Sequence, residues 1–95
     1  MLFAIRCLDK PNMAAKRAEI RPRHLEHMEE IRGQILLAGP MLADDGETPV
    51  GSIILAEFSD ANAAQAFADG DPYAQSGIFE DVDIRPFRLT IAPAG

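Results

Sequence analysis

The order in which strand-like and helix-like segments follow one another constrains the fold of this chain more than any other feature. Strand-like runs rich in apolar and β-branched residues occupy residues 2–8, 34–42, 50–58 and 79–91. Segments typical of helices occupy residues 13–32 and 61–69. The resulting order, βαββαβ, is that of the split βαβ motif. We therefore predict an α+β, ferredoxin-like fold with one antiparallel four-stranded sheet, helices on one face, and the first and third strands at the centre.

Three prolines limit where the predicted helices and strands can begin, continue or pair. Pro22 lies inside the first helical segment, where a residue without an N–H clashes with the carbonyl four positions earlier, so we expect the helix to kink or a second helix to begin there. Pro40 cannot donate to a β-ladder, which predicts that the second strand lies at a sheet edge or ends by Gly39. Pro72 favours a short turn of helix over residues 72–75.

The two central strands carry apolar residues on both faces. Ile53 and Leu55 point to one side of the third strand and Ile54 to the other, and in the first strand Phe3 and Ile5 oppose apolar neighbours. An antiparallel sheet with helices on one face normally keeps its other face polar. A second copy of the chain is the simplest cover, so we predict a homodimer through the helix-free sheet face, of the dimeric α+β barrel type. The other interpretation is one buried face with scattered apolar residues opposite.

Size and charge narrow the classes of function. The 95 residues correspond to one domain, which we place at residues 1–95. The net charge of −6 disfavours nucleic acid and anionic membranes as partners. No apolar run is long enough to span a bilayer and no signal peptide is recognisable, so we expect a cytoplasmic protein. The one cysteine, Cys7, lies in an apolar strand and is expected to be a packing residue.

Few side chains in the sequence point to chemistry. There is no metal-binding motif, no glycine-rich phosphate loop and no nucleophile elbow, so we expect neither a metal nor a cofactor. His24 and His27 are three residues apart on the first helix, but a metal site needs at least one further ligand, and the sequence identifies none. His24 shares an inward stripe with Met28 and Ile31, where its ring N–H needs a partner. The pattern alone leaves a structural histidine and a functional one both open.

Five short motifs are distributed along the chain: RPRHL at residues 21–25, LAGP at 37–40, VGS at 50–52, DPY at 71–73 and IRPFR at 84–88. Their order and spacing resemble the YCII-related (YciI-like) domain family from end to end. The resemblance implies a dimeric ferredoxin-like α+β fold, in agreement with the order of elements. One member of the family is a dehydrochlorinase acting on a chlorinated hydroxyhydroquinone, and the fold is shared with muconolactone isomerase.

The resemblance also implies site residues. The family carries a His–Asp pair as its candidate active site, which by motif is His24 and Asp71. By motif and neighbourhood, Arg21, Ser52 and Tyr73 are candidate substrate-binding residues in the wall of the pocket. We expect the His and Asp side chains to lie within direct or one-water hydrogen-bonding distance at the mouth of a partly apolar pocket.

A His–Asp pair is suited to proton transfer. The carboxylate fixes the tautomer of the ring and raises the basicity of its other nitrogen. Such a base takes a proton from a phenol or a carbon acid, which suits isomerisation or loss of a halide but supplies no nucleophile for hydrolysis. The first hypothesis is a cofactor-free lyase or isomerase acting on a small cyclic or aromatic metabolite. The alternative is a non-catalytic ligand-binding or accessory dimer, in which His24 is structural and Asp71 only caps a helix.

Overall fold

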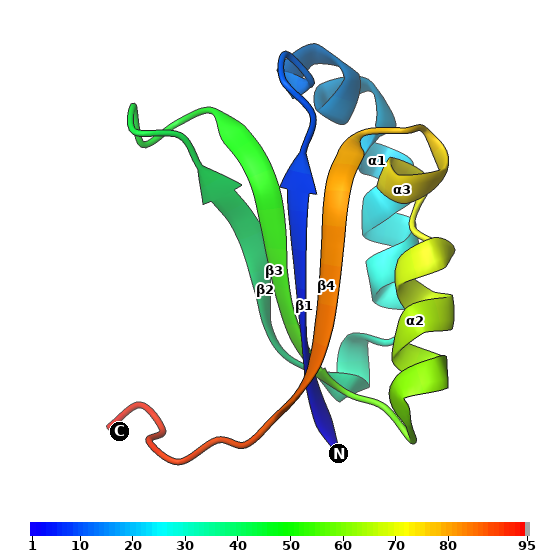
Figure 1. The fold of residues 1–95 in the computed structure, drawn as a ribbon, viewed down its shortest axis with the longest axis vertical. Helices are drawn as coiled ribbons and strands as arrows, with labels where there is room; N and C mark the ends of the chain where they lie inside the picture. Colours follow the sequence, from blue (N-terminus) through cyan, green and yellow to red (C-terminus); the bar gives the residue numbers. More distant parts are fainter. Residues whose placement is uncertain (95) are drawn as a thin grey trace.

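In the computed structural model, which describes residues 1–94, strands and helices follow one another in the predicted order. In chain order the elements are β1 (Leu2–Asp9), α1 (Ala14–Glu29), the 3-10 helix η1 (Arg32–Gln34), β2 (Ile35–Leu42), β3 (Pro49–Glu57), α2 (Ala61–Asp69), α3 (Pro72–Gln75) and β4 (Phe79–Phe87). The strands form one antiparallel four-stranded sheet in the order β2-β3-β1-β4 (Figure 1). The predicted ferredoxin-like α+β fold, with β1 and β3 at the centre, is confirmed.

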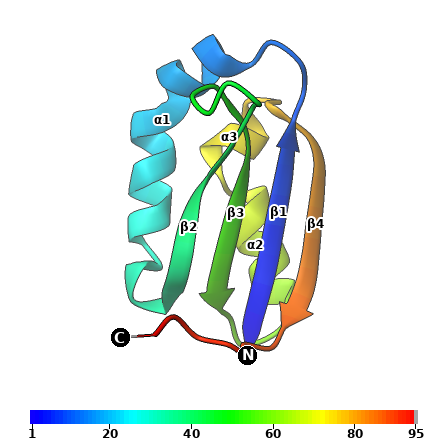
Figure 2. The same ribbon diagram turned by 90° about the vertical axis from the view of Figure 1, so that its left-hand side faces the viewer.

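The helices all lie on one face of the sheet, as Figures 1 and 2 show from two directions. Alternate residues of the central strands point towards them, and these residues form the core together with apolar side chains of α1 and α2. Its main members are Phe3, Ile5, Cys7, Met28, Ile54, Ala56 and Phe67. None of the helices within residues 1–94 is long and apolar enough to cross a membrane.

The second strand lies at the edge of the sheet, as the proline in it predicts. β2 pairs with β3 only, and Pro40 lies opposite Ser52 without ending the strand, which continues to Leu42. At an edge, a residue without an N–H interrupts no second ladder. The strand therefore delivers Pro40 to the helix-covered side of the sheet, beside Ser52.

Of the two outcomes expected at Pro22, the start of a second helix is wrong, because α1 continues through Pro22 from Ala14 to Glu29. A kink within α1 stays a prediction. Proline removes only the hydrogen bond that position 22 would have donated to the preceding turn. Residues on both sides of it are held against the rest of the molecule: Arg17 and Ile20 are buried before it, and Met28 after it. Tertiary packing therefore keeps the two halves of α1 in one helix.

The last strand is shorter than the sequence predicts. It ends at Phe87 and not at residue 91, because Phe87 already pairs with Leu2, the first residue of β1. Beyond that point the chain has no neighbouring strand to bond with. Residues 88–94 leave the sheet and run along its lower end towards the helix-free side (Figure 1).

The helix-free face of the sheet, seen from the front in Figure 2, is apolar at its centre. By strand register, the apolar residues that point to it are Leu2, Ala4, Leu8, Leu37, Met41, Ile53, Leu55 and, at the end of β4, Phe87. Leu37 on the edge strand is 53% exposed. Towards β4 the same face becomes charged, with Arg6 opposite Asp83. No helix within the described chain covers this face.

Candidate functional site

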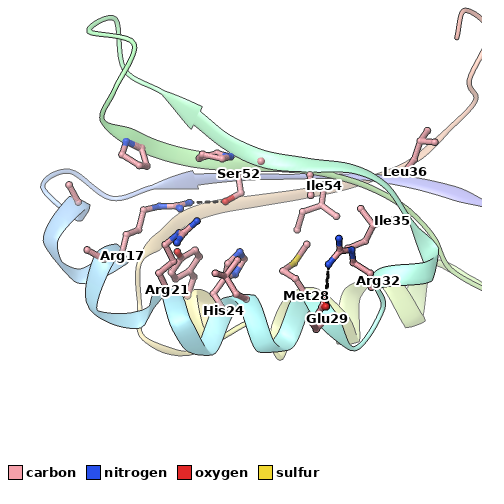
Figure 3. Close-up of a pocket in the computed structure, with 18 residues that line it drawn as sticks. Arg17, Arg21, His24, Met28, Glu29, Arg32, Ile35, Leu36, Ser52 and Ile54 are labelled. Atoms are coloured by element: carbon pink, nitrogen blue, oxygen red, sulfur yellow. Dashed lines mark hydrogen bonds and ion pairs between the residues drawn. The ribbon is translucent and has the colours of Figure 1, made fainter. Parts of the chain in front are cut away.

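A cleft of about 840 Å³ lies between α1 and the two strands β2 and β3 (Figure 3). Polar side chains enter it from α1, β3 and α3, and apolar ones line the rest. The residues that matter below are Arg17, Arg21, His24 and Met28 of α1, Pro40 of β2, Ser52 and Ile54 of β3, and Tyr73 of α3. Arg17, Arg21, His24 and Met28 recur at a spacing of three or four, which places them on one face of the helix.

The cleft contains His24, and Asp71 lies directly behind it. Nδ1 of His24 lies 2.9 Å from Oδ1 and 3.1 Å from Oδ2 of Asp71, although the two residues are 47 positions apart. A carboxylate only accepts, so in the neutral ring the proton is assigned to Nδ1 and the lone pair to Nε2. The direct contact expected between these side chains is therefore present.

The second ring nitrogen of His24 is open to the cleft. Nε2 makes no hydrogen bond to residues 1–94, and no fully buried side-chain nitrogen or oxygen among them lacks a partner. Nε2 must therefore reach open space, and Figure 3 shows the ring pointing from α1 into the cleft. The pair leaves one basic nitrogen available to a bound molecule.

Asp71 is held in place by the start of α3. Its Oδ1 also accepts from the backbone N–H of Tyr73 at 2.9 Å, which is the N-cap geometry of that short helix. The side chain is 4% exposed. The same carboxylate therefore caps α3 and orients His24, so the capping role and the contact to histidine do not exclude one another.

Tyr73 forms the floor between two basic side chains. The His24 ring stacks on it at a centroid distance of 4.0 Å and an interplanar angle of 11°, and Cζ of Arg17 lies 4.5 Å from its centroid. Burial raises the pKa of the Tyr73 phenol, while the charges of Arg17 and Arg21 act in the opposite direction. The hydroxyl is therefore protonated at neutral pH.

Arg17 is a site residue that the sequence did not identify. It is buried, and its Nε and Nη2 donate to Oδ2 and Oδ1 of Asp9 at 2.5 and 3.3 Å. Nη2 also donates to Oγ of Ser52 at 2.7 Å. Its position four residues before Arg21 and seven before His24 was the available signal, because that spacing puts all three on one helical face.

The three predicted substrate-binding residues all line the cleft: Arg21 on its exposed side, and Ser52 and Tyr73 in its interior. His27 points elsewhere. Its Nε2 lies 2.8 Å from the carbonyl oxygen of Phe67 and its ring stacks on the Phe67 ring, so it ties α1 to α2. Within residues 1–94 no three His, Cys, Asp or Glu side chains come together as a metal site.

Cys7 lies in the core behind the site and is 2% exposed. Burial raises the pKa of its thiol to about 12, and the nearby charge of Asp71 adds to the effect. The thiol is therefore neutral and packs as an apolar group, as predicted.

Comparison with known proteins finds a matching family model and similar sequences. The model of the YCII-related domain matches residues 1–88. The protein YciI of Escherichia coli O6:H1 is 41% identical over 95 residues, which cover 93% of this chain and 97% of that protein. An uncharacterized protein of Haemophilus influenzae is 35% identical with the same coverage.

Among solved structures, the fold is similar to that of 5-chloro-2-hydroxyhydroquinone dehydrochlorinase from Burkholderia phenoliruptrix in complex with 2,5-dihydroxybenzoquinone. The TM-score is 0.87 at 24% identity, with 95% of this chain and 96% of that chain covered. An antibiotic biosynthesis monooxygenase is more distant, with a TM-score of 0.55 at 15% identity and coverage of 96% and 100%. These two likenesses concern the fold.

Proposed function

This chain belongs to the YCII-related domain family, and we propose that it is a cofactor-free enzyme in which His24 and Asp71 transfer a proton to and from a small cyclic or aromatic metabolite. The observation that carries the proposal is the short contact between Nδ1 of His24 and the Asp71 carboxylate, with Nε2 left open to the cleft. This is the arrangement of an oriented general base.

The cleft supports proton transfer better than hydrolysis. Oγ of Ser52 accepts from Arg17, and no hydrogen bond joins it to His24 within the described residues. No Ser–His nucleophile is therefore formed. With Nε2 as base, a C–H or O–H bond of the substrate breaks and the proton moves to the ring. The electron pair then either shifts along the conjugated system, for isomerisation, or expels a halide ion, for elimination.

Of the two reactions, elimination by a lyase is favoured by the named activity of a protein with a similar structure. The similar structure from Burkholderia phenoliruptrix is named a dehydrochlorinase and holds a planar dihydroxyquinone. Apolar side chains of the cleft wall beside His24, namely Met28, Pro40 and Ile54, suit the ring of a ligand of that kind. A small conjugated ring compound is therefore the substrate class to test first.

The test is turnover by matched variants. Wild-type protein is incubated with 5-chloro-2-hydroxyhydroquinone and a panel of substituted hydroquinones and unsaturated lactones, and released chloride and ring absorbance are followed. We expect His24→Gln and Asp71→Asn to lower kcat by about 10²- to 10⁴-fold, the usual contribution of a general base. His27→Gln is the matched control, since it changes the other histidine of α1 and leaves the cleft intact.

The outcome that contradicts the enzyme is equally specific. If a compound of the panel stabilises the wild type and the His24→Gln variant to the same extent, and neither turns it over, His24 has no chemical role. The non-catalytic ligand-binding or accessory dimer then becomes the function of this chain.

We further propose that two copies associate through the helix-free face. The apolar centre of that face would otherwise meet water, with Leu37 53% exposed at its edge. Light scattering at micromolar concentration should give twice the chain mass. Ile53→Glu, at the centre of the face, should shift the mass to that of one chain, whereas Leu25→Glu, exposed on α1, should not. A monomeric wild type would refute the dimer.

A further inference from the structure

The cleft is much longer than the part of it that holds His24. Its wall on the helix side begins at Ala14 and ends at Arg32, and His24 lies near the middle of that stretch. From His24 to Arg32 the wall is about 10 Å long, at 1.5 Å per helical residue. The volume of about 840 Å³ points the same way, because a cavity of roughly 150 Å³ already holds a benzene ring. One small ring at His24 therefore fills only part of the cleft.

The part of the cleft that extends from His24 towards the start of β2 has apolar walls. Figure 3 shows Met28 of α1 and Ile54 of β3 facing each other there, with Ile35 of β2 beyond them. By strand register Ala38 lies opposite Ile54, on the same side of the sheet. We call this part the apolar arm, and its wall residues are Leu25, Met28, Ile35, Ala38 and Ile54.

The buried polar side chains of the cleft gather at its other end. There Arg17 donates to Ser52 at 2.7 Å, and Figure 3 shows His24 between that bond and Met28. Glu29 and Arg32 line the arm on its exposed side, with side chains 61% and 77% exposed, and they pair with each other at 2.9 Å. Their charges balance each other, so that pair calls for no charged group on a ligand.

Part of the apolar wall is open to water. Leu25 is 45% exposed, Ala38 is exposed and Ile35 is half-buried, although all three line a concave site. Covering apolar surface is favourable in proportion to the area removed from water. An apolar group bound beside these residues would therefore add to the affinity of any ligand that reaches His24.

We propose that the apolar arm is a substrate subsite, and that the substrate carries an apolar substituent of several carbon atoms on its reacting ring. This inference rests on the proposed function, because it names the substrate class of the same site. The ring lies at Nε2 of His24, and its substituent lies between Met28 and Ile54 and extends towards Ile35. The arm then selects substrates by the length of their apolar substituent.

The experiment compares ligands that differ only in that substituent. The probes are hydroquinone and its methyl, butyl and hexyl derivatives, and dissociation constants are measured by isothermal titration calorimetry with the full chain. Burial of one methylene group changes an affinity about three- to fourfold. Butylhydroquinone should therefore bind about 10- to 50-fold more tightly than methylhydroquinone.

Two variants change the arm at exposed positions. Ala38→Leu adds bulk inside the arm and should weaken hexylhydroquinone about 10-fold or more, while hydroquinone changes less than about threefold. Leu25→Gln makes one wall polar and should weaken hexylhydroquinone about three- to tenfold. Ala66→Leu, at an exposed position of α2 outside the cleft wall, is the matched control and should change neither affinity. Circular dichroism confirms that each variant is folded.

Three results would overturn the subsite. They are an affinity that does not rise with chain length, including no binding of any probe, a chain-length dependence that Ala38→Leu leaves unchanged, and a change of molecular mass in either arm variant. The last would mean that another copy of the chain covers the arm.

The same probes separate this inference from the proposed function. His24→Gln should abolish turnover and keep the dependence of binding on chain length. A protein that distinguishes the chain lengths but turns over none of the compounds retains the subsite and loses the proposed enzyme. A protein that binds and turns over short and long substrates equally well retains the enzyme and loses the subsite.

Discussion

The buried ion pair between Arg17 and Asp9 gives the sharpest stability prediction. Their side chains are 7% and 3% exposed, and two hydrogen bonds join them. Asp9→Asn leaves the guanidinium buried with no anion to balance it. Breaking a buried pair in this way costs about 3–5 kcal/mol. Because Arg17 lines the cleft, where water can partly solvate it, we expect about 3 kcal/mol.

That loss is large for a chain of this size, whose total free energy of unfolding is of the order of 5–15 kcal/mol. With a urea slope of about 1.5 kcal/mol/M, the midpoint of unfolding should fall by roughly 2 M. The measurement is urea unfolding followed by circular dichroism, at one fixed protein concentration because association would shift the apparent stability.

The matched control is the exposed pair formed by Glu29 and Arg32, whose side chains are 61% and 77% exposed. Glu29→Gln should cost no more than about 1 kcal/mol, because water already solvates both charges. The double variant Asp9→Leu with Arg17→Met should recover most of the lost stability, since no buried charge remains. If Asp9→Asn costs less than about 1 kcal/mol, or the double variant is no better than the single one, the pair is not the buried unit described here.

Two further predictions concern the first and third strands. Gly51→Ala should lower the free energy of unfolding by about 1–3 kcal/mol, because a Cβ at Gly51 would lie 2.4 Å from the carbonyl oxygen of Cys7 and from Cε of Met41. Gly39→Ala is the control and should be nearly neutral, because a Cβ there meets nothing within 4 Å. The midpoints of urea unfolding compare the two variants. Burial raises the pKa of the Cys7 thiol from 9.0 to about 12, so its contribution to stability is complete below pH 9 and is lost as the pH rises from 9 towards 12. The free energies of unfolding at pH 8 and pH 10.5 should therefore differ less in Cys7→Ala than in the wild type. The same difference in both proteins would contradict the raised pKa of the Cys7 thiol.

Much of the fold was predictable because its signals are local. The edge position of β2 follows from Pro40, and the observed α2 and α3 have the predicted bounds, since Asp60 and Asp71 cap them with side-chain hydrogen bonds. Two expectations, a second helix beginning at Pro22 and a last strand reaching residue 91, were wrong because distant parts of the chain decide both. The packing of both halves of α1 outweighs Pro22, and the length of β4 is set by where its neighbour begins at Leu2.

The candidate site was predictable only in part. His24 and Asp71 are 47 positions apart, and no spacing rule connects them; the family motifs brought them together. No motif marks the Arg17–Asp9 pair, and the sequence around Arg17, with several glutamates in α1, predicts an arginine exposed to solvent. Only the tertiary structure shows that the end of β1 delivers Asp9 to the inner side of the helix, where Arg17 is buried.

Two carboxylates of the site, Asp9 and Asp71, are placed so that they orient basic groups. Asp9 and Asp71 belong to the site but neither lies on the wall of the cleft as far as residues 1–94 describe it. Each lies behind a basic group, Arg17 or His24, and fixes its orientation. A bound molecule would therefore meet Arg17 and His24 and not these two carboxylates, while Glu29, which does line the cleft, is paired with Arg32. The same two carboxylates thus hold Arg17 and His24 in place without lining the cleft themselves.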